Sequence, residues 1–352
     1  NEAEDLAILL DSGANAVRTS HYQDSQSWYD RCDRAGLAVW TEIPNWQLGS
    51  TAPLYLENGK QQLRELIRQN YNHPSIFFWG VGNETYGPAA DGLAEAFAKV
   101  AKSEDPSRLS TYAQNQSASD PKAWYTDVVG FNRYFGWYAD TLAAFAPWLD
   151  QTRAQHPKAR FGMSEYGAGA SVSQHEEDVK PPAPRGHWHP EEYQNLYHET
   201  YAAALRGRPY VWGTFIWCLF DFASDGRDEG DHAGRNDKGL VTYDRRTKKD
   251  AYFLYKAAWT QAPVLHITSA GFTDRTAAAT EIKVYSNARE VTVALNGVSL
   301  GAKADADGSH VFRWPGATLA VGENRVTATA VFPGGAATDA CVWTLRASSA
   351  TR

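Results

Sequence analysis

The 352 residues of the chain are enough for one large domain and a smaller second one. Hydrophobic residues make up 43% of the sequence and charged residues 21%, which excludes an intrinsically disordered chain. The net charge of -7 argues against nucleic acid and anionic membranes as partners. The three cysteines (Cys32, Cys218 and Cys341) are spaced too widely for a zinc motif or a disulfide framework.

Strands and helices alternate over residues 1–261, a pattern typical of a parallel α/β sheet. Strands are predicted at residues 14–19, 37–41, 75–81, 108–112, 127–131, 160–165 and 210–217. Helices are predicted at residues 2–12, 26–35, 53–71, 89–103, 139–156, 190–206 and 248–259. These are seven of the eight strands that close a (β/α)8 barrel, and the chain begins in the helix that would follow the first strand. We therefore expect a TIM-type barrel that is N-terminally incomplete, with an open doubly wound sheet as the alternative.

The pattern changes to consecutive short strands in residues 262–352. Asn296 and Gly297 form a two-residue hairpin turn between two of these strands. Strands are predicted at residues 264–268, 281–286, 290–295, 298–300, 310–314, 324–331 and 340–345. We expect a small immunoglobulin-like β-sandwich as a second domain.

The first residue is not a methionine and lies inside a predicted helix, so we expect a fragment or a processed product. No apolar run is long enough to cross a membrane, and no signal peptide is visible. The cellular compartment therefore stays unknown.

Two predicted barrel strands end in a glutamate. Glu84 follows an almost unbroken apolar run, and Glu165 ends the strand at residues 160–165. Parallel barrels carry their chemistry at the carboxyl ends of their strands, so we expect both side chains to face one pocket. Two carboxylates are the minimum equipment for cleaving a glycosidic bond.

The surroundings of the two glutamates suggest different roles. Aromatic and apolar residues precede Glu84, and burial among them raises a carboxyl pKa, which suits a general acid. Glu165 lies next to Tyr166, and a nearby hydroxyl could keep a carboxylate ionised, which suits a nucleophile. The sequence is also rich in aromatic residues, with 13 Trp, 18 Tyr and 14 Phe. Many follow predicted strands, where flat rings could stack on the apolar faces of sugars.

The motifs around these glutamates resemble those of glycoside hydrolase family 2, which contains β-galactosidases, β-glucuronidases and β-mannosidases. The acid/base motif is matched by HPS at residues 73–75 followed by Asn83-Glu84, and the nucleophile motif by SEYG at residues 164–167. Further matches are NAVRTSHY at 15–22, NRYFGWY at 132–138, FIW at 215–217, DFASDG at 221–226 and NDKGLV at 236–241. The resemblance extends to about Trp259 and implies a retaining exo-β-glycosidase with no cofactor.

The resemblance also implies roles for individual residues. Glu84 would be the acid/base and Glu165 the nucleophile, with Tyr134 supporting it. Asn83 would bind the sugar 2-hydroxyl, Trp217 would form the floor of the sugar site, and Arg18, His21 and Asn132 would line it. For Arg18, pairing with Glu42 or Glu165 is the alternative.

Two departures from the family pattern affect these expectations. The earlier strand and the preceding sugar-binding domains are missing, so the barrel is open unless a second chain or the missing N-terminal part closes it. Some family β-galactosidases also bind magnesium through a Glu and a His. The matching residues 44–48 (PNWQL) contain neither, so no metal is predicted.

The identity of the sugar is less constrained. The loops at residues 167–189 and 221–238 look most like those of β-galactosidases, which makes a β-galactoside the first choice of substrate. Asn236, Lys238 and Tyr138 resemble the residues with which β-glucuronidases hold a uronic carboxylate, so β-glucuronidase is the second choice.

Two other classes of protein compete with these enzymes. A metal-dependent hydrolase would use His175, His187, His189, Asp231 and His232, whose spacing matches no compact ligand motif. A non-catalytic sugar-binding protein is the other alternative, because the barrel lacks a strand.

Overall fold

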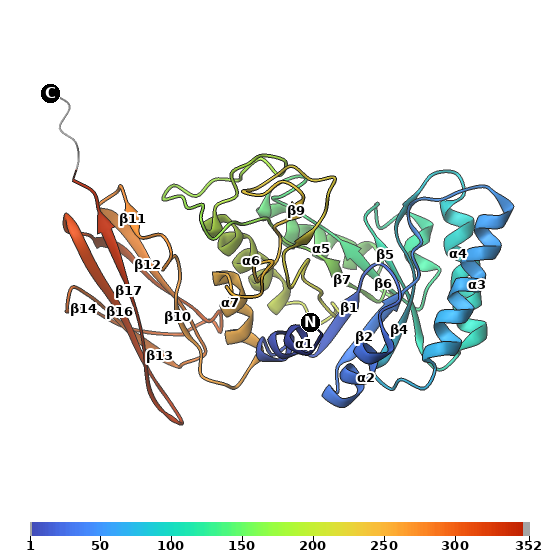
Figure 1. Cartoon of the computed structure of the whole chain (residues 1–352), viewed down its shortest axis with the longest axis horizontal. Helices are drawn as coiled ribbons and strands as arrows, with labels where there is room; N and C mark the ends of the chain where they lie inside the picture. The colour runs from blue at the N-terminus through green and yellow to red at the C-terminus, as the bar shows by residue number, and fades with distance from the viewer. Residues whose placement is uncertain (1, 348–352) are drawn as a thin grey trace.

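The computed structural model describes residues 2–347 and has a curled parallel sheet with helices, followed by a β-sandwich (Figure 1). The parallel sheet runs in the order β1-β2-β4-β5-β6-β7, and β3 pairs with β4 at one end. Its strands are β1 (Ala16–Thr19), β2 (Ala38–Glu42), β3 (Trp46–Leu48), β4 (Ile76–Tyr86), β5 (Leu109–Gln114), β6 (Val128–Asn132) and β7 (Phe161–Glu165). The TIM-type sheet with one side open, expected from the sequence, is therefore confirmed.

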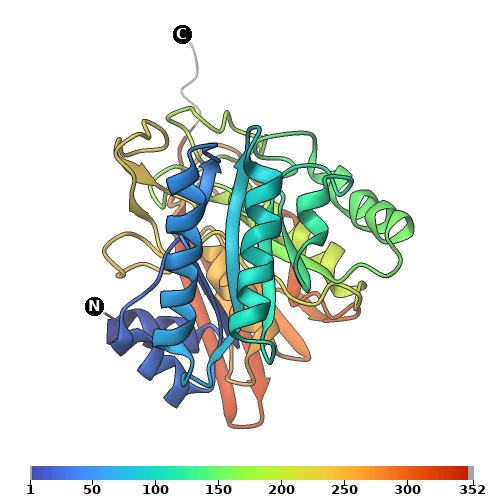
Figure 2. The same cartoon turned by 90° about the vertical axis from the view of Figure 1, so that its right-hand side faces the viewer.

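Helices cover the outer face of this sheet, and α3 and α4 lie side by side across β4 in Figure 2. The helices are α1 (Glu2–Asp11), α2 (Gln26–Ala35), α3 (Pro53–Asn70), α4 (Ala90–Glu104), α5 (Phe145–Gln155), α6 (Glu191–Arg206) and α7 (Asp250–Trp259). On α4, Leu93 and Phe97 lie one helical turn apart and are both buried in the core between helix and sheet. The helices thus cover the outer face of the sheet, and strands β6 and β7 are buried throughout.

The strand predicted at residues 210–217 is wrong as a regular strand. The segment is extended along β7, where Trp212 N donates to Phe161 O at 3.2 Å and Trp217 N donates to Tyr166 O at 2.8 Å. Among the described residues, the segment forms one isolated bridge with β7, between Met163 and Thr214, and no continuous ladder. No described strand pairs with its other edge.

A cavity of about 1640 Å³ separates this segment from β1, with Ala16 on one side and Phe215 on the other. The described chain leaves the sheet open along this seam, which continues to the carboxyl ends of the strands, where His21 and Glu84 also line the cavity.

Several other boundaries differ from the predictions. The helix expected at residues 139–156 begins later, with a 3-10 turn at Leu142–Ala144 before α5. Pro147 lies in the first turn of α5, and a proline ring would clash with a carbonyl one turn earlier if the α-helix extended further back. Strand β3 and the two short strands β8 (Phe222–Ala223) and β9 (Arg235–Asn236) were not predicted, because they are too short to show a periodic pattern.

The C-terminal region folds into two largely antiparallel sheets that pack face to face around a core containing Val284, Val293, Phe312 and Trp343. One sheet has the order β10-β12-β15 and the other β11-β17-β16-β13-β14. Their bounds are β10 (Leu265–Ile267), β11 (Asp274–Arg275), β12 (Ala279–Ser286), β13 (Glu290–Leu295), β14 (Val298–Ala304), β15 (Val311–Thr318), β16 (Gly322–Phe332) and β17 (Gly335–Leu345). The predicted sandwich is confirmed, whereas β11 was missed, and the immunoglobulin type stays a prediction.

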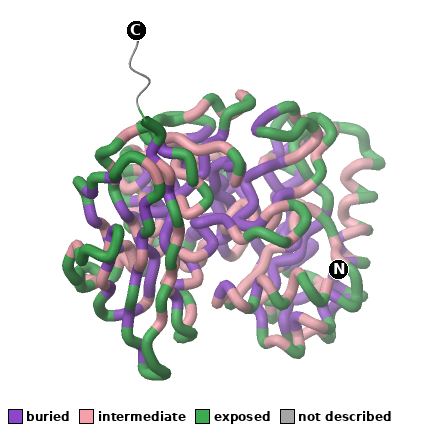
Figure 3. The backbone as a smooth tube through the Cα atoms, turned by 60° about the vertical axis from the view of Figure 1, so that its left-hand side comes forward, coloured by how far each residue is buried: buried purple, intermediate pink, exposed green. Residues whose placement is uncertain are grey.

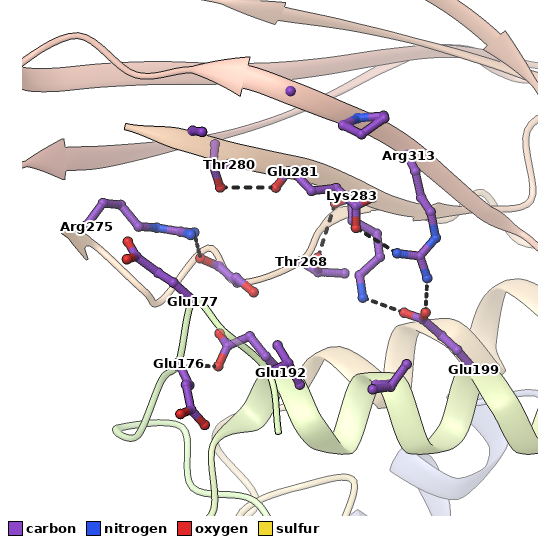
Figure 4. Close-up of a pocket in the computed structure, with 16 residues that line it drawn as sticks. Glu176, Glu177, Glu192, Glu199, Thr268, Arg275, Thr280, Glu281, Lys283 and Arg313 are labelled. Carbon is purple, nitrogen blue, oxygen red and sulfur yellow. Dashed lines mark hydrogen bonds and ion pairs between the residues drawn. The ribbon is translucent and has the colours of Figure 1, made fainter. Parts of the chain in front are cut away.

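A cleft between α6 and the sandwich carries ion pairs that join the two parts (Figure 4). Glu199 on α6 accepts a hydrogen bond from Lys283 Nζ at 2.6 Å and also pairs with Arg313.

Figure 3 shows the buried backbone concentrated inside the sheet region and the sandwich, with exposed loops around both. Across residues 2–347, no helix combines the length and the apolar character needed to traverse a bilayer.

Candidate active site

A cavity of about 590 Å³ lies at the carboxyl ends of the parallel strands and contains both predicted glutamates. Glu84 is near the end of β4, and Glu165 is the last residue of β7. The predicted residues that line this cavity are His21, Asn83, Glu84, Asn132, Tyr134, Tyr138, Glu165 and Trp217. Arg18 and Asn236 line the adjoining seam cavity, whereas Lys238 is buried and lines neither cavity.

Both oxygens of Glu165 are held by hydrogen bonds. Arg18 Nη1 donates to Oε1 at 2.7 Å, and the Tyr134 hydroxyl donates to Oε2 at 2.8 Å. These two donors, on β1 and just after β6, fix the orientation of the Glu165 carboxyl group. Burial, followed by the charge of Glu165, raises the pKa of Tyr134 well above its usual value, so Tyr134 stays a donor.

Arg18 is shared between two carboxylates, so both alternatives expected for it are found. Its Nε and Nη2 donate to Glu42 at 3.1 and 2.9 Å, in addition to the bond with Glu165. Burial alone would lower the pKa of Arg18, but Glu42 and Glu165 raise it above its usual value. Burial would likewise raise the pKa of Glu42, but Arg18 and His21 hold it below the usual range. Arg18 therefore stays charged beneath the site and fixes the direction of Glu165.

Glu84 has a different environment from Glu165. Its backbone φ is 51°, in the left-handed region that non-glycine residues seldom adopt. Its Oε1 accepts one hydrogen bond from Asn132 Nδ2 at 2.8 Å. Burial, followed by the negative charge of Glu165, raises the pKa of Glu84 above its usual value. Glu84 is thus protonated to a higher pH than an ordinary glutamate.

An amide network connects the strands that carry the two glutamates. Asn132 donates to Asn83 Oδ1 at 3.0 Å, and its own Oδ1 accepts from the Ser164 hydroxyl at 2.6 Å. Arg18 Nη2 also donates to Asn83 Oδ1, at 2.9 Å. Since these bonds occupy the oxygen of Asn83, its amide N–H groups remain for a ligand in the cavity.

Three rings are stacked at the mouth of the cavity. The ring of His21 lies 5.3 Å from that of Trp217 and 6.1 Å from that of Trp46, with interplanar angles of 15° and 9°. His21 Nδ1 also donates to Glu42 Oε1 at 2.8 Å. Trp217 thus offers an indole face to the cavity, and Trp46 extends the stack outward.

Lys238 is only 1% exposed, and its ammonium makes no hydrogen bond within the described residues. Its Nζ lies 3.6 Å from Glu229 Oε1 and 5.1 Å from the ring centroid of Tyr138. Leaving a buried ammonium without hydrogen bonds is costly, which makes Lys238 a candidate partner for an anionic group of a ligand.

The turn that carries Lys238 is held in place by hydrogen bonds from His189 and Lys249. His189 Nδ1 donates to Asp237 Oδ2 at 2.5 Å, and Lys249 Nζ donates to Asp237 O at 2.8 Å. Burial alone would raise the pKa of Asp237, but His189 holds it below the usual range. Asp237 therefore remains charged and keeps its two neighbours, Asn236 and Lys238, in place.

The histidines considered for a metal-dependent hydrolase do not come together. His189 is bound to Asp237, and His175 Nδ1 contacts Glu192 at 2.9 Å. Among residues 2–347, the only group with metal-ligand spacing is Asp30, Asp33 and His73. That cluster lies on α2 and the loop before β4, outside the residues that line the cavity, and Asp33 also accepts from Ser75 N.

Several residues that line the cavity were not predicted from the sequence, including Trp46, Gln47, Asn115, Trp148 and Arg227. Arg227 Nη1 donates to the Tyr138 hydroxyl at 3.3 Å. In the sequence, Trp46 stands out only as part of residues 44–48, which lack metal ligands. Its position as a large aromatic residue shortly after a predicted strand is the feature that could have indicated a place in the site.

Comparisons with known proteins place this geometry in context. Residues 2–263 match the model described as glycosyl hydrolases family 2, TIM barrel domain, and residues 278–338 match a domain of unknown function. A β-glucuronidase of Bacteroides fragilis is 41% identical over 336 residues, which cover 93% of this chain and 48% of that protein.

Solved structures agree with the sequence matches. A B. fragilis protein provisionally named β-galactosidase has a TM-score of 0.93 at 36% identity, covering 98% of this chain and 52% of that one. A Bacteroides uniformis β-glucuronidase has a TM-score of 0.86 at 33% identity, covering 98% of this chain and 43% of that one. The chain thus spans about half the length of the relatives that it matches.

Proposed function

The chain belongs to glycoside hydrolase family 2, and we propose that it is the part of a retaining exo-β-glycosidase that cleaves terminal β-glucuronides. We assign catalysis to residues 1–261 and treat residues 262–352 as a separate domain. The hydrogen-bonded Glu165 and Glu84, whose pKa is raised, face one cavity and supply the two functions that this chemistry requires.

In the first step, a carboxylate oxygen of Glu165 attacks the anomeric carbon while the bond to the departing oxygen breaks. Glu84 gives its proton to that oxygen, and the aglycone leaves as a neutral alcohol. Arg18 and Tyr134 hold Glu165 in position for the attack. The sugar is then bound covalently to Glu165 with inverted configuration.

In the second step, Glu84 is a carboxylate and takes a proton from water. The water oxygen attacks the anomeric carbon, and the bond to Glu165 breaks, which restores both side chains. Two inversions leave the sugar with its original configuration. Asn83, whose amide nitrogen donates to no described residue, would bind the 2-hydroxyl during both steps.

The observation that carries the choice of sugar is the buried ammonium of Lys238, which lacks a hydrogen-bond acceptor in the described chain. A uronic carboxylate that reaches past Tyr138 would provide that acceptor, and Arg227, which pairs with Glu229, also lines the cavity beside Tyr138. The names of the B. fragilis and B. uniformis β-glucuronidases support the same choice. We therefore place β-glucuronides ahead of β-galactosides, reversing the order expected from the loop sequences.

A β-galactoside remains the second candidate because the solved structure with a TM-score of 0.93 is provisionally named as a β-galactosidase. A neutral sugar would leave the ammonium of Lys238 without a hydrogen-bond acceptor, with only the carboxylate of Glu229 nearby at 3.6 Å, so it explains less of the site. A non-catalytic sugar-binding protein would bind the sugar without releasing nitrophenol, so a turnover assay distinguishes it from both candidates.

The test is a panel of nitrophenyl β-glucuronide, β-galactoside and β-mannoside, assayed with the chain and with its Lys238→Met variant. We expect the glucuronide to be the best substrate and the variant to lose about 100-fold in kcat/KM on it, the order expected for one charge-assisted hydrogen bond. Lys158→Met, on an exposed lysine away from the cavity, is the matched control. A galactoside preference that Lys238→Met leaves unchanged would refute the proposed specificity.

A further inference from the structure

Trp46 is a large aromatic side chain that the fold leaves half exposed at the mouth of the candidate active site. Its exposed fraction is 49%, whereas Trp28, Trp40, Trp79 and Trp137 of the same region are buried. It lines both the cavity of the two glutamates and the adjoining seam cavity. Among the described residues, none accepts a hydrogen bond from its indole N–H. A core role therefore does not explain this residue.

The backbone holds Trp46 firmly despite this exposure. Asn45 O accepts from Asn83 N at 2.9 Å, and Gly49 N donates to Tyr86 O at 3.0 Å, so both ends of β3 are bound to β4. The Asn45 side chain adds a bond from Nδ2 to Val81 O at 3.0 Å. Trp46 is consequently carried on a fixed strand rather than on a free loop.

The same arrangement places Trp46 beside Glu84. In the pairing of β3 with β4, Trp46 lies opposite Asn83, the residue before Glu84. Gln47 and Glu84 both have left-handed backbone angles, with φ of 57° and 51°, where the two paired strands become irregular. Left-handed non-glycine residues are often found at ligand-binding sites.

The chemistry of Glu84 determines which part of a substrate Trp46 would meet. The acid must lie next to the departing oxygen, so the aglycone begins at Glu84 and extends out of the sugar pocket. The ring of His21 stacks with both Trp217 and Trp46, and Trp46 is the more exposed of the two indoles. An indole face binds flat apolar groups, and an aromatic pair adds attraction beyond the area it buries.

We propose that Trp46 is the platform of an aglycone site that favours a flat aromatic leaving group. The inference rests on the proposed glycosidase function, because it takes Glu84 as the acid. It adds a specificity-determining residue on the leaving-group side, whereas Lys238 acts on the sugar side.

The test compares phenyl and methyl glycosides, which share a sugar and differ only in the aglycone. We expect Trp46→Ala to lower kcat/KM for the phenyl substrate by about 10-fold and to change the methyl substrate by less than about 2-fold, the order of an aromatic pair. Trp46→Phe should recover most of the loss. Trp188→Ala is the matched control, since Trp188 is 51% exposed and lines neither cavity.

A binding measurement separates this proposal from the catalytic one. Phenyl and methyl thio-β-glycosides, made as both glucuronides and galactosides, are titrated calorimetrically into the chain and its Trp46→Ala variant. A phenyl preference that disappears in Trp46→Ala supports the platform even if the chain hydrolyses nothing, in which case only the catalytic proposal fails. The platform is refuted if the wild-type chain binds both aglycones equally, or if Trp46→Ala weakens the methyl compound as much as the phenyl one.

Discussion

Tyr134 donates a hydrogen bond from its hydroxyl to Oε2 of Glu165 at 2.8 Å, across 31 residues of sequence. Tyr134 lies just after β6, and Glu165 ends the neighbouring strand β7, so pairing of the two strands brings them together. In the proposed mechanism, this bond would stabilise the Glu165 carboxylate before it attacks and would weaken as the covalent bond to the sugar forms. We therefore expect Tyr134 to affect both the formation and the breakdown of the covalent intermediate.

The Tyr134→Phe variant tests this relationship. It keeps the ring and removes only the hydroxyl, so Glu165 loses one of its two donors. We expect kcat for nitrophenyl β-glucuronide to fall about 10- to 100-fold, the order of one hydrogen bond to a charged group. Unchanged kcat, with an unchanged midpoint of thermal unfolding, would show that the hydroxyl has no role.

Replacing each glutamate by glutamine should affect a different step of the reaction. Glu165→Gln removes the nucleophile, so we expect nearly all activity to disappear for every aglycone. Glu84→Gln removes the acid, and a nitrophenolate leaves without help, so the first step should survive while the second slows. Added azide should then restore turnover in Glu84→Gln and give a β-glycosyl azide, identified by NMR. Wild-type rates in Glu165→Gln would contradict the nucleophile assignment.

The pKa of Glu84 should change during the reaction. Burial and then the charge of Glu165 raise it in the free protein. The acid form is needed in step one, so a raised pKa keeps it protonated to higher pH, and kcat/KM should fall as pH rises through that pKa. Bonding to the sugar removes the charge of Glu165, so the pKa of Glu84 should drop and free the carboxylate for step two. Carbon-13 NMR of labelled glutamate, before and after trapping with a 2-fluoro sugar, measures both values. An equal or higher pKa in the trapped form would contradict this mechanism.

His189 should influence sugar binding without touching the sugar. It holds Asp237, which lies between Asn236 and Lys238, through a 2.5 Å hydrogen bond. We expect His189→Ala to raise KM for the glucuronide about 10-fold, because the turn that presents Lys238 loses its support. His187→Ala, on an exposed histidine two residues away, should leave KM unchanged. Equal KM values in the two variants would exclude a positioning role.

Glu199 should contribute to the stability of the contact between α6 and the sandwich. Glu199→Gln leaves Lys283 and Arg313 without their shared carboxylate, and we expect the free energy of unfolding to fall by about 1 to 3 kcal/mol. Glu281→Gln, whose carboxylate meets only Arg313 at the surface, should change it by less than about 0.5 kcal/mol. Urea titrations of both variants provide the comparison. A similar loss of unfolding free energy in the two variants would show that the buried Glu199 ion pairs stabilise the protein no more than the exposed pair does.

Much of the fold follows from local sequence patterns. Apolar runs that end in Asn83-Glu84 and in Ser164-Glu165 predict buried parallel strands, and parallel strands present their carboxyl ends at one edge. For this reason the shared location of the two glutamates could be expected without coordinates. The family could also be identified from the sequence, because each motif is a short run of consecutive residues that needs no tertiary structure to be seen.

The tertiary structure alone decided which partners those side chains have. The bond between Arg18 and Glu165 spans 147 residues, and no local pattern could choose between Glu42 and Glu165 before both were found at 3.1 Å or less. The exposure of Trp46 and the burial of Lys238 likewise depend on neighbours contributed by distant segments. Hydrophobic periodicity reports which face of a segment is buried, whereas hydrogen bonding and desolvation depend on what packs against that face.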